Sequence, residues 1–177
     1  MKKFLIVVVF ILLVAVLYLA MNGAFSSIVV KEDSMPGYRI VGIEHRGPYE
    51  KIGDSFNRIH ELADSYGVPV KMIGVYFDNP EKVPSDSLRS IAGIIVSEND
   101  SVKLSREGSI VNFSIPPGTA AVTDFTTEGK IAMIIGAMKS YPALTKYMEA
   151  SGKADSIQFV YEVYSEMSTR YVMQYTH

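Results

Sequence analysis

The feature that most constrains this chain is an uninterrupted apolar run close to its N-terminus. Residues 4–21 contain no charged side chain. As a helix, the run would extend roughly 27 Å at about 1.5 Å per residue, close to the thickness of bilayer hydrocarbon. A single helix is the form that satisfies every backbone group of such a segment in lipid. We therefore expect a transmembrane helix at 4–21, with the lipid bilayer as its partner.

Two other interpretations of this run stay open. A cleaved signal peptide has a shorter apolar region, usually about 7–15 residues, and ends in small residues, a pattern that Asn22 fits poorly. A buried core helix would show a polar stripe, which this run lacks. Lys2 and Lys3 precede the run, and basic flanks favour the cytoplasmic side. The expected localisation is a single-pass membrane protein, with residues 1–3 cytoplasmic and the rest extracytoplasmic.

Composition limits what the remainder can do. Residues 22–34 are predicted to be a juxtamembrane linker with a brief strand at 28–30, and residues 35–177 have the length of one domain. The chain has no cysteine and a net charge of −2, which excludes disulfides and thiol chemistry and argues against a nucleic-acid partner. Histidine spacing suits no metal, and no phosphate-binding glycine motif is present, so we expect no metal and no cofactor.

The hydrophobic pattern predicts the same order of elements twice. In the first half, strands are expected at 38–44, 72–77 and 90–97, with an amphipathic helix after Pro48. In the second half, strands are expected at 110–115, 119–125, 157–164 and 170–175. A helix follows Gly129, is interrupted at Pro142 and resumes there as a fresh helical turn. Two pseudo-repeated strand-helix-strand-strand units predict an α+β fold, with an antiparallel sheet and the helices on one face.

Glu162 is the strongest candidate for a functional side chain. It shares a strand face with Val160 and Tyr164, and a carboxylate in so apolar a strand is costly to bury without a partner. It could meet a ligand cation beside tyrosine rings, and a raised pKa would also suit acid–base work. The alternative is an exposed glutamate on a wet sheet face. Tyr76, beside Gly74 on its strand, suits either a cleft wall or ordinary packing.

Three segments, taken in order, resemble the GyrI-like family. They are residues 45–56 (His45 to Tyr49, then Ile52-Gly53 and Phe56), residues 73–80 and residues 159–164. The resemblance implies two pseudo-repeated units with a ligand cleft between them, which takes a small apolar or amphipathic molecule. The ligand-binding residues that it implies are Glu162, Tyr164, Tyr76, Tyr49 and His45.

The resemblance also leaves two other functions open. An anchor followed by this domain is similar to a membrane-anchored subtype of the family, the testis-expressed receptors for autophagy of the endoplasmic reticulum, which implies a protein partner. A few family members resemble hydrolases that use a glutamate, in which case Glu162 would be the catalytic base. We expect binding rather than catalysis.

Overall fold

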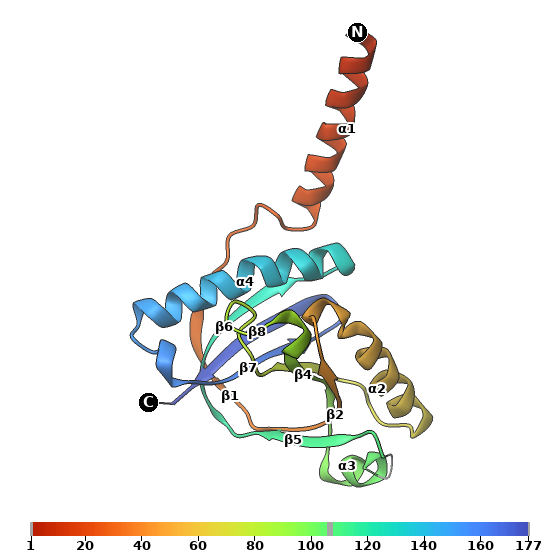
Figure 1. The fold of residues 1–177 in the computed structure, drawn as a ribbon, viewed down its shortest axis with the longest axis vertical. Coiled ribbons are helices and arrows are strands. Elements are labelled where there is room, and N and C mark those ends of the chain that lie inside the picture. The colour runs from red at the N-terminus through yellow and green to blue at the C-terminus, as the bar shows by residue number, and fades with distance from the viewer. Residues whose placement is uncertain (1, 106–107, 177) are drawn as a thin grey trace.

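The computed structural model describes residues 2–105 and 108–176 (Figure 1). The helices are α1 (Lys2–Met21), α2 (Gly53–Ser65), α3 (Glu98–Leu104) and α4 (Lys130–Ala150). The strands are β1 (Lys31–Met35), β2 (Tyr38–Arg46), β3 (Met72–Tyr76), β4 (Arg89–Ile95), β5 (Val111–Ile115), β6 (Gly118–Thr126), β7 (Ile157–Tyr164) and β8 (Ser168–Tyr175).

One antiparallel sheet of eight strands carries the domain, in the order β1-β6-β8-β7-β3-β4-β2-β5. Exchanging β1 with β5, β2 with β6, β3 with β7 and β4 with β8 gives the same order read from the opposite edge of the sheet. The first strand of each half pairs with the other half: β1 lies against β6 and β5 against β2. The α+β fold with two similar units is therefore confirmed, and its pseudo-twofold axis passes between β3 and β7.

Both long helices of the domain cover the same face of the sheet. Helix α2 packs on β2 and β4, and α4 packs on β6 and β8. The opposite face curls around a core of its own, in which Ile40, Ile73, Tyr161 and Val172 are buried. Because α2 and α4 each cover one end of the sheet, the central strands β3 and β7 face the seam between them.

Helix α2 forms as its periodicity predicts. Ile52, Ile59 and Ala63 recur at helical spacing and are buried, with Ile59 and Ala63 in contact with the sheet core. Gly67 follows the helix with φ +63°, a left-handed conformation that glycine adopts without steric cost at helix ends.

Helix α4 corrects the prediction of a break at Pro142. The helix is continuous from Lys130 to Ala150, with Pro142 inside it. Because Pro142 is exposed, water can replace the hydrogen bond that its missing N–H denies to the carbonyl of Met138. The sheet-facing residues are spaced by four and are mostly small at the N-terminal end (Ala132, Gly136, Ser140, Leu144 and Met148).

Helix α1 stands apart from the domain (Figure 1), and none of its residues is buried. Its most apolar 18-residue window has a mean hydropathy of 3.3, so by length and composition the helix could cross a membrane or act as a signal sequence. The chain then turns at Asn22 to Phe25. The first strand of the domain is β1, Lys31–Met35, in place of the brief strand predicted at 28–30.

Helix α3 was not predicted. Its N-terminus is capped by Ser97, whose hydroxyl accepts from the backbone N–H of Asp100 and donates to the carboxylate of the same residue. This serine followed three residues later by an acidic residue is a capping signal that the sequence does contain.

Candidate functional site

At the centre of the sheet, the pseudo-twofold axis places two equivalent positions face to face, and the two positions hold different residue types. In the register of β3 and β7, Gly74 lies directly opposite Glu162. Two residues further along each strand stand Tyr76 and Tyr164, on the same face as their neighbours. The two halves therefore supply matching tyrosines, but one supplies a carboxylate where the other supplies no side chain.

The Glu162 side chain is buried, with 6% of its residue surface exposed, and is held by three phenol groups. Tyr141 donates to Oε1 at 2.7 Å, and Tyr76 donates to Oε2 at 3.1 Å. Tyr164 also donates to Oε2. Among the residues that the structure describes, no lysine, arginine or histidine forms an ion pair with Glu162.

Burial sets the protonation of this group. Desolvation raises the pKa of Glu162 above its ordinary value, and the hydrogen bonds from Tyr164, Tyr141 and Tyr76 lower it in part. Desolvation also raises the pKa values of the three tyrosines well above 10, so they remain neutral donors. The arrangement can hold a proton, or it can present a desolvated negative charge to a cation.

Aromatic rings surround the carboxylate from both helices in a near-symmetric way. Phe56 of α2 meets Tyr164 edge-on at 5.4 Å between ring centroids, and Tyr141 of α4 meets Tyr76 at 6.4 Å. Gly74 leaves room for these rings, because a Cβ there would lie 2.9 Å from the Tyr76 hydroxyl and 3.3 Å from the Phe56 ring. The four rings surround the Glu162 carboxylate, and the absence of a side chain at Gly74 leaves space for them.

The five residues predicted for the site divide into two groups. Glu162, Tyr164 and Tyr76 come together as described. Tyr49 packs edge-on against Tyr76 at 4.9 Å, but its hydroxyl donates to the Asp78 carbonyl at 2.8 Å and not to Glu162.

His45, the fifth predicted residue, lies outside this group. Its Nε2 is 3.1 Å from the carbonyl oxygen of Pro48, which ties the turn before α2. Asp78, next to the site in sequence, is engaged by Arg89 through its carboxylate at 2.8 Å. Both residues therefore shape the turns that flank the site.

Sequence reasoning missed Tyr141 and Phe56 as site residues. Each lies on a helix, and which side of a helix faces a seam depends on tertiary packing. The available signal was indirect: Phe56 belongs to the apolar stripe of α2, and Tyr141 precedes the proline of α4.

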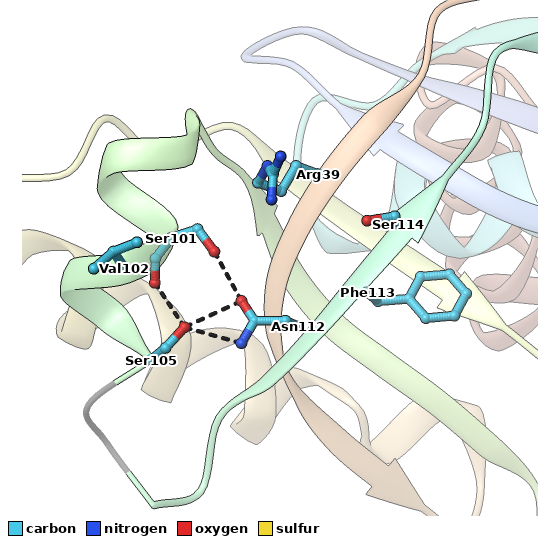
Figure 2. Close-up of a pocket in the computed structure, with 7 residues that line it drawn as sticks. All are labelled: Arg39, Ser101, Val102, Ser105, Asn112, Phe113 and Ser114. Carbon is cyan, nitrogen blue, oxygen red and sulfur yellow. Dashed lines mark hydrogen bonds between the residues drawn. The ribbon is translucent and has the colours of Figure 1, made fainter.

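Two surface pockets lie away from Glu162. One, of about 430 Å³, lies between α3, β2 and β5; in it the Asn112 side chain bonds to Ser101 and Ser105 (Figure 2). The other, of about 400 Å³, lies between the end of α1 and β6. Glu162 and the tyrosines that bond to it line neither pocket. Within 2–105 and 108–176, no group of three acidic or histidine side chains is placed to hold a metal ion.

Comparison with curated proteins finds two kinds of relative. A DNA gyrase inhibitor of Escherichia fergusonii is 30% identical over 101 residues, covering 56% of this chain and 61% of that protein. Testis-expressed protein 264 homolog of Mus musculus is 25% identical over 135 residues, covering 72% of this chain and 43% of that protein. The chain thus spans between about two fifths and three fifths of the curated relatives it matches.

Solved structures share the fold at low sequence identity. The C-terminal domain of EcmrR superposes with a TM-score of 0.64 and 12% identity, covering 84% of this chain and 98% of that one. SAV2435, solved bound to tetraphenylphosphonium, gives a TM-score of 0.56 and 9% identity, covering 84% and 94%. The model for the GyrI-like small molecule binding domain matches residues 30–173. The chain therefore belongs to the GyrI-like family.

Proposed function

We propose that the domain binds an amphipathic organic cation at the seam between α2 and α4, with Glu162 as its counter-ion. The supporting observation is the buried carboxylate, which the described part of the chain provides with phenol donors but no basic partner. A buried acid of this kind is costly when ionised, and a cation would offset that cost. The tyrosine rings add cation–π attraction of about 0.5–2 kcal/mol.

Binding in this way requires the tyrosine side chains that cover Glu162 to move and open a path to its carboxylate. Tyr76, Tyr141 and Tyr164 are partly exposed, so they form the outer layer over Glu162 and can turn outward without opening the sheet core. The SAV2435 structure, a relative in fold, holds tetraphenylphosphonium. That molecule combines an apolar body with a positive charge, which is the chemistry that a carboxylate ringed by phenols suits.

The binding test uses the full chain in nanodiscs titrated with tetraphenylphosphonium, with empty nanodiscs as the correction for partition into lipid. We expect Glu162→Gln to weaken binding by about tenfold or more, equivalent to about 1.4 kcal/mol. Glu166→Gln, an exposed glutamate at the end of the same hairpin, is the matched control and should bind as the wild type does. Equal affinity of Glu162→Gln and the wild type would remove Glu162 as the counter-ion.

The charge requirement can be tested without mutation. Triphenylphosphine oxide is a neutral molecule with three of the same rings, and we expect it to bind at least about tenfold more weakly than the cation. Affinity for the cation should rise with pH through the raised pKa of Glu162, since only the ionised carboxylate attracts it. A flat pH profile would contradict this mechanism.

The domain is further proposed to be tethered to a membrane by residues 4–21. The support is an apolar helix with mean hydropathy 3.3, none of whose residues is buried against the domain. Resistance of the full chain to extraction by alkaline carbonate would support a transmembrane anchor. Protease treatment of sealed vesicles would then test the proposed topology, with the domain on the side opposite the N-terminus. Release of a shortened chain into solution would instead support a cleaved signal sequence.

A further inference from the structure

One surface of the domain is apolar where solvent exposure would favour polar side chains. On the outer side of α4, Ile131, Ile134 and Met138 lie three and four residues apart and are 38%, 56% and 72% exposed. We call these three residues the α4 ridge. They lie on one side of the helix, opposite Gly136 and Ser140, which face the sheet. In the N-terminal half of α4, these large apolar side chains therefore point outward while small residues face the sheet.

Helix α2 shows that this is not a general property of the fold. Its outward positions are polar and exposed (Asn57, Arg58, His60, Glu61 and Asp64). Its large apolar residues face the core, as Ile59 does. The two helices occupy equivalent places in the two halves, so the apolar exposure belongs to α4 specifically. An exposed apolar stripe of this kind marks a surface that meets another apolar phase or partner.

The segment that leaves α1 is fixed to the same helix. The ammonium group of Lys139 donates to the carbonyl oxygens of Gly23, Ala24 and Ser26 at 3.1, 2.7 and 2.5 Å. Gly23 also sits against the Phe125 ring so closely that a Cβ would lie 2.7 Å from it. These contacts hold the end of α1 beside α4 and limit how far the domain can move from the anchor.

The direction of α1 identifies the partner of the ridge. In Figure 1, α1 rises from the N-terminal half of α4 and points away from the sheet, on the side of α4 that the sheet does not cover. The residues at its foot are also apolar and exposed: Met21 is 78% and Phe25 is 72% exposed. An amphipathic helix at a membrane surface buries its apolar side by about 5–10 Å at the boundary between headgroups and acyl chains.

We propose that the α4 ridge rests in the interfacial layer of the same bilayer that α1 crosses. The inference depends on the proposed tether. Lys130 is exposed at the start of α4 and suits contact with lipid phosphates. Beyond Pro142 the outward residues Thr145 and Glu149 are polar, so contact is confined to the N-terminal half of α4.

The absence of cysteine from the chain allows a clean test. Single cysteines carrying a bimane label would be placed at Met138, at Leu12 in the middle of α1, and at Val102. Val102 is a matched control, because it is 63% exposed on α3 at the far end of the domain from α1 (Figure 1). The full chain would be reconstituted in vesicles with and without brominated lipid, and iodide would be the aqueous quencher.

If the inference is correct, the labels at positions 12 and 138 are quenched by brominated lipid, and the label at 102 is not. Iodide quenching at 138 should be at least about threefold weaker than at 102. The substitutions Ile131→Gln and Ile134→Gln, both at exposed positions, should restore iodide access at 138 without changing the label at 12.

Two results would overturn the inference and leave the anchor intact. In the first, the label at 12 is quenched by lipid while that at 138 is as open to iodide as that at 102. In the second, the label at 138 is protected from iodide but not quenched by lipid, which would mean that a second copy or another protein covers the ridge. If the label at 12 is not quenched by lipid, the anchor and the ridge contact both fail.

Discussion

The two halves of the domain have the same order of elements but use their helices in opposite ways. In α2, large apolar residues such as Ile59 face the sheet and polar residues face outward. In α4, small residues such as Gly136 face the N-terminal part of the seam and large apolar residues such as Ile134 face outward. The difference follows from the sheet beneath: under α4 it presents the bulky rings of Phe125 and Tyr171, which leave room only for small side chains. One architecture therefore tolerates two ways of filling the space between helix and sheet.

The strongest test of this comparison is a pair of isoleucines. Ile59→Ala should reduce the free energy of unfolding by about 2–5 kcal/mol, because Ile59 is fully buried and its loss leaves a cavity. Ile134→Ala, at a 56% exposed position, should change it by less than about 0.5 kcal/mol. Urea unfolding of the full chain in detergent micelles would measure both. Equal effects would show that the ridge of α4 is packed in solution.

A pair of glycines gives the next largest effect. Gly136→Ala would place a Cβ 2.6 Å from the Tyr171 hydroxyl and 2.9 Å from the Phe125 ring, and should destabilise by about 1–3 kcal/mol. Gly53→Ala, at the start of α2, meets nothing within 4 Å and should stabilise by up to about 1 kcal/mol. Thermal unfolding of both variants would measure these stability changes. A stabilising Gly136→Ala would mean that α4 can move away from the sheet at no net cost.

The smallest expected effect concerns Glu162, the acidic residue that one half has at the axis where the other half has Gly74. In the folded state the pKa of Glu162 lies above its ordinary value of 4.5. The stability that it contributes is therefore fully present below pH 4.5 and is lost as the pH rises through the folded pKa. Glu162→Gln should remove this decline and be more stable than the wild type at neutral pH.

Unfolding midpoints measured from pH 4 to pH 8 would check this dependence. The control variant Glu166→Gln should lose stability with rising pH as the wild type does. The same decline with pH in Glu162→Gln would show that another group is responsible.

The sequence predicted the fold well where side-chain pattern alone decides the structure. Strand β7 was predicted with its observed bounds, and the order of elements in the two halves was confirmed. Prediction was less successful where packing decides. Proline chemistry favours a break at Pro142, yet α4 continues through it because tertiary contacts hold both halves of the helix.

For the candidate site, strand alternation was enough to place Glu162 and Tyr164 on one face, and Tyr76 joins them across the strand pair. The contribution of Tyr141 could not be predicted in the same way. Its hydroxyl meets Glu162 only because α4 turns its small residues toward β6 and β8, and nothing in the periodicity of a helix with apolar residues on several sides selects that rotation.

The opposition of Gly74 and Glu162 also bears on how such a domain can arise. An assembly of two identical half-domains would place the same residue at both positions. Two glutamates would bring like charges together in a dry site, and two glycines would leave no acid at all. A lone acid at a twofold axis therefore requires two copies with different sequences, and in this chain the two copies are joined. Divergence of the two repeats, which a single chain fixes in a one-to-one ratio, is thus a condition for the site.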